Sequence, residues 1–284
     1  NKALITNTSG NNNTGIGSQA DVATSTLVNA TAIGASAIVN TSNTIQLGDS
    51  NITLVQTSGT VSAAAFVGDG SRLSNVNTGV TDSSNNVFIG NSALASNTLG
   101  STNVAIGLSA LKSNTSGSDN VAIGRAAMMF NGGGTKNVAI GGGSLENNSS
   151  DENIGIGYRA LFLNTSGNNV AVGTSALENN TTGTINTAVG NKTLRSNTIG
   201  AYNSGFGNEA LISNTTGSNN TAIGVNASRA NQSSNNNTAV GYNALFANTG
   251  AQNAAVGSNA LSTNTTGNFN TALGYESLSR NVSG

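Results

Sequence analysis

Apolar and polar positions follow a short, fixed repeat along most of the chain. A tripeptide such as Ala-Ile-Gly returns every 17 residues, or every 16 in three copies. Its glycine stands at Gly90, Gly107, Gly124, Gly141, Gly157, Gly173, Gly190, Gly207, Gly224, Gly241, Gly257 and Gly274. Weaker copies end at Gly17, Gly34 and Gly48. A fixed period of this kind is typical of a solenoid, in which each repeat forms one coil and stacks on the next.

The residues inside one repeat favour strands and turns over helices. Runs such as Thr-Ala-Val-Gly are rich in strand formers, and no 3.6-residue periodicity is present. Seventeen residues suit one coil of two short strands and two turns. Because successive coils would pair as parallel strands about 4.8 Å apart, twelve coils predict a rod of roughly 55–60 Å. The predicted fold is an all-β parallel β-solenoid, or β-roll.

Two apolar columns are the predicted core. The residue before the glycine is large and apolar, as in Ile106 and Ile123. The fourth residue after the glycine is nearly always Leu, as in Leu111, with Met128 and Ser228 as exceptions. Burial of each such side chain contributes roughly 1.5–3 kcal/mol relative to exposure.

Two further columns are predicted to lie beside this core. The second residue before the glycine is almost always Ala or Gly, and strand alternation points it away from the Ile/Val column. Its strict smallness predicts that another backbone lies close. The third residue before the glycine changes from Val or Ile up to Val170 to mostly Thr from Thr187 onward. That change predicts that this column lies on a partly solvated face or at an interface between chains.

Two columns of Asn complete the repeat, four residues before the glycine and seven residues after it. They include Asn103, Asn114, Asn120, Asn131, Asn137, Asn203, Asn214, Asn220 and Asn270. Stacked Asn side chains bond their equivalents one layer away, at about 1 kcal/mol per hydrogen bond. The alternative is that Asn supplies only turn geometry, and the two roles are compatible. The 16-residue copies lose their residue between these two columns, where a turn tolerates a change of length.

The pattern divides the chain into three parts. Residues 1–48 hold degenerate coils, residues 49–85 interrupt the pattern, and residues 86–284 form the main solenoid of about twelve coils. The interruption contains Phe66-Val-Gly-Asp-Gly-Ser-Arg-Leu73, which predicts short strands around a tight turn in an inserted β connector. Both ends of the sequence cut through a coil. We therefore expect the native chain to continue in both directions, or coils to stack end to end between molecules.

The composition argues against most kinds of catalytic and metal-binding site. Only 7% of residues are charged, the net charge is −1, and His, Cys, Pro and Trp are absent. No nucleic-acid or membrane partner is expected from that charge, and no apolar run is long enough to span a bilayer. Without His or Cys, neither a nucleophilic triad nor a metal site is expected, and no cofactor is predicted. Asp151-Glu152 is the only adjacent acidic pair, and a solvated turn explains it. The chain is not expected to be an enzyme.

Exposed aromatic residues are the best candidates for contacts with a ligand or a partner. Tyr158, Tyr242 and Tyr275 directly follow the glycine, in a column that varies freely, and Phe162 and Phe246 share another variable column. Aromatic side chains of this kind stack on the apolar faces of sugars. The alternative is that they cover the shoulder of the coil or fill a seam between chains.

The Asn-Val-Ala-Ile-Gly units at residues 103–107, 120–124 and 137–141 resemble the head repeats of trimeric autotransporter adhesins. Similar units occur in phage-type tail fibres, and the resemblance covers about 200 residues. It implies a left-handed parallel β-roll in which three chains wrap about one axis. The repeat is longer here than in the adhesin heads, because the Ala-Leu-x-x-Asn-Thr-Thr-Gly half is added. The connector also looks like those of fibre proteins.

Three functions are left open at this point. The first is a structural fibre or stalk in an extracellular, cell-surface or virion appendage, in which the chain's main partner is itself as a homotrimer. The second is an adhesive head that binds glycan or matrix on a bacterial surface. The third is ice binding, although Thr lies in turns and in only half of one strand column, so no flat Thr array is formed.

Overall fold

The computed structural model describes residues 2–51 and 82–284. These ranges are the described parts of two compact units, called here the N-terminal unit (2–51) and the main solenoid (82–284). Both consist of parallel strands and turns, and the described residues contain no helix. None of them therefore forms a helix with the length and apolarity needed to cross a bilayer. The all-β parallel solenoid predicted from the sequence is confirmed.

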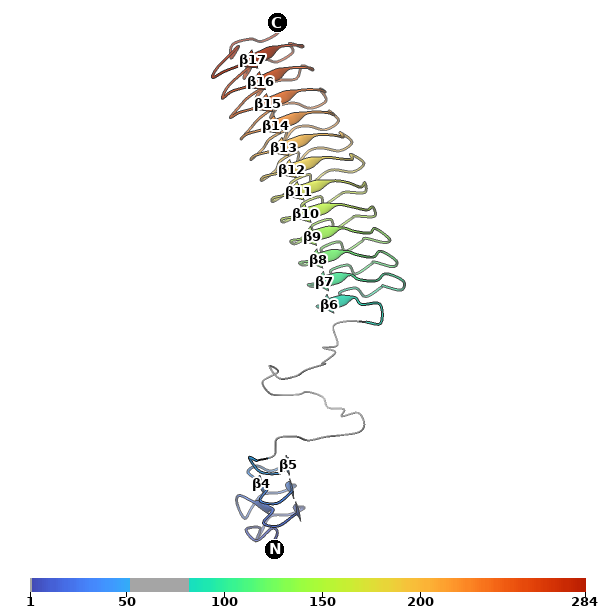
Figure 1. Cartoon of the computed structure of the whole chain (residues 1–284), viewed down its shortest axis with the longest axis vertical. Coiled ribbons are helices and arrows are strands. Elements are labelled where there is room, and N and C mark those ends of the chain that lie inside the picture. The colour runs from blue at the N-terminus through green and yellow to red at the C-terminus, as the bar shows by residue number, and fades with distance from the viewer. Residues whose placement is uncertain (1, 52–81) are drawn as a thin grey trace. The chain divides into compact units, whose positions relative to one another are not determined.

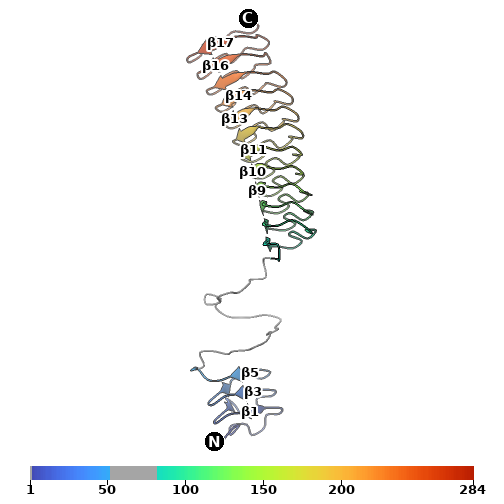
Figure 2. The same ribbon diagram turned by 45° about the vertical axis from the view of Figure 1, so that its right-hand side comes forward.

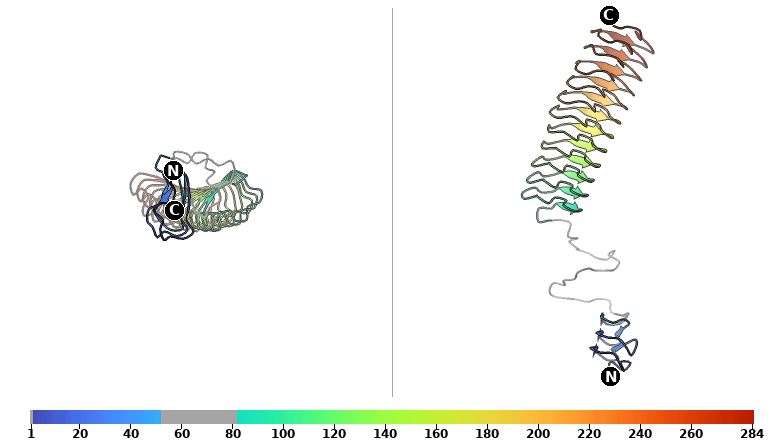
Figure 3. Two further views of the ribbon diagram at one scale, coloured as in Figure 1. Left: turned by 90° about the horizontal axis from the view of Figure 1, so that it is seen from below. Right: turned by 180° about the vertical axis from the view of Figure 1, so that it is seen from behind.

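The main solenoid is built on one 12-stranded parallel sheet in which neighbouring strands follow each other in sequence (Figure 1). Its strands are β6 (Val87–Ile89), β7 (Val104–Ile106), β8 (Val121–Ile123), β9 (Val138–Ile140), β10 (Ile154–Ile156), β11 (Val170–Val172), β12 (Thr187–Val189), β13 (Ser204–Phe206), β14 (Thr221–Ile223), β15 (Thr238–Val240), β16 (Ala254–Val256) and β17 (Thr271–Leu273). Seen along the stack, successive coils nearly superpose (Figure 3). Residues one repeat apart therefore lie on adjacent rungs.

Register is kept even where a repeat is one residue short. Ile106 pairs with Ile123 across a 17-residue step, and Ile154 pairs with Val138 across a 16-residue step. Every strand of this sheet has three residues. In the shorter coils the turn closes by a direct bond between the two Asn columns, as from Asn153 Nδ2 to Asn148 Oδ1 at 3.1 Å. The turn absorbs the missing residue, as predicted.

The opposite wall of each coil in the main solenoid is a chain of turns, whereas a second short strand was expected there. We call it the turn wall, from the glycine to the second Asn (107–114 in one coil). Bonds of 3.1–3.3 Å close successive turns, as from Ala110 N to Gly107 O and from Lys112 N to Ser109 O. Ser109 and Leu111 have φ of 59° and 49°. The expectation of two strands per coil is thus wrong for the main solenoid. Figure 2 shows these loops stacked in register.

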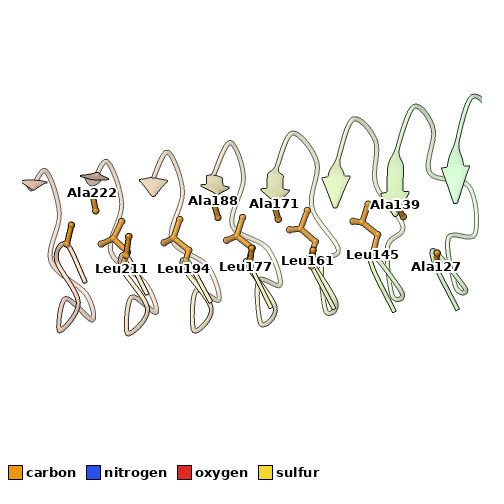
Figure 4. Packing of buried hydrophobic residues seen from close by; sticks show 14 of the residues in the cluster. Ala127, Ala139, Leu145, Leu161, Ala171, Leu177, Ala188, Leu194, Leu211 and Ala222 are labelled. Carbon is orange, nitrogen blue, oxygen red and sulfur yellow. The ribbon is translucent and has the colours of Figure 1, made fainter. Parts of the chain in front are cut away.

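The interior of the main solenoid is filled by the Leu column of the turn wall packed against the Ala column of the strands (Figure 4). Leu111, Leu177 and Ala105 are all fully buried. A Cβ added at Gly155 in the Ala column would lie 2.6 Å from Ser144 Oγ and 3.2 Å from both Ala160 O and Leu145 Cγ. The residue of the Ala column must be small because the coil is thin and the turn wall fills it. The groups close to the small column are therefore side chains and backbone of the turn wall of the same chain.

The Ile/Val column lies on the outer face of the sheet, so its prediction as core is wrong. Ile106 is half-buried, whereas Ile123 and Ile223 are 37% and 43% exposed. Strand alternation was applied correctly, but the inward face was assigned to the wrong set of residues. The Val/Thr column, with Val104 and Thr187, shares this outer face and is half-buried in most coils.

Both Asn columns bond from coil to coil in the main solenoid, and all of their members except Asn97, Asn270 and Asn281 near its ends are buried. Asn103 Oδ1 accepts bonds of 3.0 Å from both the backbone N and Nδ2 of Asn120. Asn131 Nδ2 donates to Asn114 Oδ1 at 2.9 Å, and Asn114 Nδ2 also donates to Gly117 O at 2.9 Å. Similar bonds join the equivalents of these residues, among them Asn137, Asn203, Asn214, Asn220 and Asn270. Buried amides are satisfied in this way without water.

Gly and Thr in the connecting turn have packing and bonding roles of their own. A Cβ added at Gly117 would lie 2.3 Å from Gly134 O and 2.5 Å from Asn114 Oδ1. Thr198 Oγ1 donates to Thr215 O of the next coil at 3.0 Å, and most Thr of this column repeat the bond. The Asn-Thr-Thr-Gly consensus therefore encodes a third line of bonds between coils.

In the N-terminal unit, a second strand takes the place of the turn wall. Its strands β1 (Thr14–Ile16), β3 (Thr31–Ile33) and β5 (Ile45–Leu47) form one parallel sheet, and β2 (Asp21–Val22) and β4 (Ile38–Val39) form a second. Ala20, Val22, Ala37 and Val39 are buried between these sheets. Here two coils have two strands each, whereas Leu4 before them has a positive φ of 50°, as in the Leu column of the main solenoid. The predicted connector at 49–85 lies mostly outside the described residues, which resume at 82.

Candidate functional site

Three variable columns cover the outside of the turn wall, at one, two and five residues after the glycine. In the first of these, Arg125, Gly142 and Tyr158 follow one another on successive coils after β8, β9 and β10. In the second, Ala126, Gly143 and Arg159 do so. These two columns carry side chains in the coils on either side, so Gly142 and Gly143 leave one coil bare.

A hollow of about 310 Å³ lies over that bare coil, and we call it the Tyr158 hollow. It is lined by Arg125, Gly142, Gly143, Glu146, Tyr158, Arg159 and Phe162. A Cβ at Gly142 would lie 3.6 Å from Tyr158 Cδ2, and one at Gly143 would lie 3.6 Å from Phe162 Cδ2. Both aromatic rings therefore flank the glycine floor. The 60% exposure of Tyr158 leaves most of its side chain accessible.

A network of charges supports one wall of the hollow. Glu178 is almost fully buried and lies 3.0 Å from Arg159 Nη1 and 2.9 Å from Arg195 Nε. The Arg159 guanidinium also stacks 4.1 Å from the centre of the Phe162 ring. A buried carboxylate held by two guanidinium groups fixes the position of Arg159, which in turn fixes Phe162.

The remaining charges of the hollow have no such partner. Within residues 2–51 and 82–284, neither the Arg125 guanidinium nor the Glu146 carboxylate makes an ion pair or a side-chain hydrogen bond. Three arginines and two glutamates surround the site, so its local charge is +1, in a chain of which only 7% is charged.

The second predicted aromatic pair lies in a different setting. Tyr242 is 54% exposed, and Arg229 lies 5.8 Å from the centre of the Phe246 ring while it pairs with Glu209 at 3.1 Å. The coil before Tyr242 carries Val225 and Asn226 where the first site has two glycines. This pair thus has the aromatic residues of the first site without its bare floor.

Tyr275, the fifth predicted contact residue, lies apart from both pairs on the coil of β17 and is 73% exposed. A hydrogen bond with the adjacent Glu276 and the charge of that carboxylate raise the pKa of Tyr275. The structure therefore brings Tyr158 together with Phe162 at one hollow and places Tyr242 and Phe246 on another coil, but it does not gather all five residues into one surface.

Sequence reasoning missed the floor and the charged rim of the hollow. Neither the run Gly141–Gly143 nor Arg125 and Glu146 was predicted to belong to a site. Comparison of columns would have found them, because Gly142 and Gly143 occupy positions that carry side chains in neighbouring coils.

Asp151 and Glu152 are acidic residues that lie outside the hollow. The described residues contain no group of three or more His, Cys, Asp or Glu side chains placed to hold a metal ion. Asp151, from the adjacent acidic pair, accepts bonds of 2.7 and 3.0 Å from the backbone N and Oγ1 of Thr135. Glu152 lies 3.9 Å from Lys136 in an exposed ion pair. Both acids thus link neighbouring coils.

Comparison of the chain with protein-family models, with curated proteins and with solved structures finds no match. Functional conclusions therefore depend on the geometry of this chain and on the motif resemblance described above.

Proposed function

We propose that this chain is a structural segment of a fibre or stalk in an extracellular or virion appendage, and that it works as a left-handed homotrimer. The observation that carries the proposal is the exposure of apolar side chains on the outer face of the 12-stranded sheet. Two columns of Val, Ile and Thr run along this face, and Ile89, Ile123, Ile140 and Ile223 are 53%, 37%, 37% and 43% exposed.

A continuous apolar stripe of this kind is unusual on a monomer and marks an interaction surface. In the proposed trimer the stripe of each chain packs against those of the other two. The resemblance to adhesin head repeats supports the same arrangement. Burial of the stripe would also explain why the column before the glycine stays aliphatic or aromatic although it is not part of the core.

The internal construction of the main solenoid also suits a fibre. Each coil contacts mainly its neighbours, so the stack grows in length without a change of cross-section. Stability comes from columns of Leu, Ala and Asn that repeat from coil to coil. A rod of this type transmits force along its axis, with no site of catalysis required.

The mass of the protein in solution tests the proposal. Sedimentation equilibrium is expected to give three times the 28.0 kDa of one chain. The double variant Ile123→Asp and Ile140→Asp places charges on the stripe and is expected to give single chains with unchanged circular dichroism. Lys112→Asp, on the turn wall, is the matched control and should keep the trimer. A wild-type protein that is folded and monomeric at micromolar concentration would overturn the trimeric fibre.

Location in an appendage requires its own measurement. Immunogold labelling of intact cells or virions with an antibody against residues 86–284 is expected to decorate projecting fibres. Labelling confined to the cell interior would contradict this part of the proposal.

The Tyr158 hollow favours a second function, adhesion to a glycan. The hollow lies on the turn wall, so it does not use the apolar stripe of the sheet. A fibre with such a site on its side would combine a mechanical role with attachment. Binding of sugars by the purified protein, lost on Tyr158→Ala, tests this second function independently of the mass measurement.

A further inference from the structure

We infer that the Tyr158 hollow binds a single acidic sugar residue, such as a uronic or sialic acid, with Arg125 as the residue that recognises its carboxylate. The inference rests on the second, adhesive function and does not depend on trimer formation.

The size of the hollow limits the ligand to about one ring. Its volume of about 310 Å³ is at the lower end of the range for small-molecule sites, about 300–1,000 Å³. Arg125 and Tyr158 lie two coils apart in the same column, about 9.6 Å at about 4.8 Å per coil. Gly142 between them carries no side chain, so one sugar ring can take the place that a side chain holds in other coils.

Aromatic surface selects a ligand with an apolar face. The Tyr158 side chain is exposed beside Gly142, and the Phe162 ring lies beside Gly143. The C–H groups on one face of a pyranose pack on such rings. Because Phe162 is held by Arg159, and Arg159 by the buried Glu178, this surface is preorganised and loses little side-chain freedom on binding.

Charge selects an acid among sugars. Arg159 is already paired with Glu178, and Arg195 shares that carboxylate, whereas the Arg125 guanidinium has no ionic partner in the described part of the chain. A guanidinium binds a carboxylate through two parallel hydrogen bonds. Glu146, also without a partner in those residues, lies at the rim near Gly143 and can accept hydrogen bonds from sugar hydroxyls. A ligand with both a carboxylate and hydroxyl groups satisfies both side chains.

The test uses glucuronate, galacturonate and N-acetylneuraminate as probes, each beside its neutral methyl ester, with binding measured by saturation-transfer NMR. We expect at least one acid to bind in the millimolar range or tighter, and its ester to bind roughly tenfold more weakly because one charge-assisted pair is lost. Acid and ester that bind equally would overturn the role of Arg125 while adhesion stands. No binding of any acid or ester at 10 mM, about ten times the expected dissociation constant, would overturn the site.

Variants assign the binding to the hollow. Arg125→Gln should remove the preference for acid over ester, and Tyr158→Ala should weaken both. Gly142→Leu should block both, and it should fold, because Leu108 occupies the same column and a Cβ at Gly142 meets no atom closer than 3.6 Å. Tyr242→Ala is the matched control and should bind as wild type. If Gly142→Leu binds as wild type while remaining folded by circular dichroism, the proposal is wrong.

Discussion

The two units of this chain close the same kind of coil in two different ways. In the N-terminal unit, Ala20 and Val22 point inward two residues apart, with Asp21 between them directed outward, and the wall is a strand. In the main solenoid, Ala110 and Leu111 are adjacent in sequence and both are fully buried. A strand directs neighbouring side chains to opposite faces, so the second arrangement requires a different backbone.

The main solenoid obtains this backbone from residues with positive φ. Leu111 has φ of 49°, and its equivalents in the other coils have values between 47° and 54°. Such angles cost a non-glycine residue roughly 1–2 kcal/mol. The wall persists because these residues, except Leu278 in the last coil, are buried and bond through their N–H to the next coil, as from Leu111 to Ala127 O at 3.0 Å. A one-residue shift of the apolar position thus decides between a strand and a chain of turns.

The largest expected difference between the units lies in their Asn residues. Asn120→Ala in the main solenoid removes an amide that bonds to coils on both sides. It leaves the backbone N of Asn137 without its acceptor, whereas Gly134 O keeps its bond from Asn131 Nδ2. The unsatisfied N–H costs about 1–3 kcal/mol, and the three other amide bonds that are lost contribute about 1 kcal/mol each, so the loss should be about 4–6 kcal/mol. Asn29→Gly in the N-terminal unit removes one exposed bond, keeps a residue that tolerates the positive φ of this position, and should cost less than about 0.5 kcal/mol. Hydrogen exchange of the flanking strand amides measures both, and equal losses would contradict the ladder as the main support.

Ser228 interrupts the Leu column and offers a gain of stability. Its hydroxyl is buried and, among the described residues, has no hydrogen-bond partner. Ser228→Leu should stabilise the main solenoid by about 1.5–3 kcal/mol from apolar burial alone. Leu211→Ser, one coil earlier, is the reciprocal control and should destabilise. Urea unfolding measures both changes, and destabilisation by Ser228→Leu would mean that this coil has contracted around the serine.

A smaller effect is expected at the residue five positions before the glycine, which has positive φ in both units. The N-terminal unit uses Asn12, Asn29 and Asn43 there, and Asn tolerates this conformation. The main solenoid places Ile185 there with φ of 57°. Ile185→Asn should therefore stabilise by about 1 kcal/mol, measured by urea unfolding. Asn236→Ile should destabilise by a similar amount, and no change in either variant would mean that this angle carries no strain.

The smallest effect concerns pH at the first coil of the main solenoid. Asp82 takes the place of an Asn from a preceding coil, because Asn86 Nδ2 bonds both of its carboxylate oxygens at 3.1 and 2.9 Å. These bonds lower the pKa of Asp82. The carboxylate therefore stabilises the coil above its ordinary pKa of about 4, and this contribution is lost as the pH falls through the lower folded pKa.

Hydrogen exchange of Val87 N, followed from pH 5 to pH 2 and corrected for intrinsic rates, should show this loss of protection. Asp82→Asn should remove it. The N-terminal unit is an internal reference, because Asp21 also has a lowered pKa: burial raises it, and hydrogen bonds from Val22 and Thr6 outweigh that effect. Its response should be unchanged in Asp82→Asn, and a change there would show that the variant acts on more than its own coil.

The candidate site was predictable in part. Tyr158 and Phe162 could be chosen from the sequence because aromatic residues stand out in columns that otherwise vary. The hollow beside them is not visible within any one repeat, because it is made by the absence of side chains at Gly142 and Gly143 on one coil and by Arg125 on the coil before. A site assembled from three successive coils becomes visible only when those coils are superposed.

The sequence by itself determined the parallel solenoid, the coil of about 17 residues, the register and the place where a missing residue is absorbed. These follow from periodicity, since equivalent residues one repeat apart must stack if each coil is to bury its apolar positions. Only the tertiary structure decided which face is inside. The alternation of side chains along a strand places Ala105 and Ile106 on opposite faces of the sheet, but it does not determine which of them points inward. The Leu column of the opposite wall settles that choice, because it fills the thin interior and leaves room only for alanine, so the larger aliphatic residues lie outside.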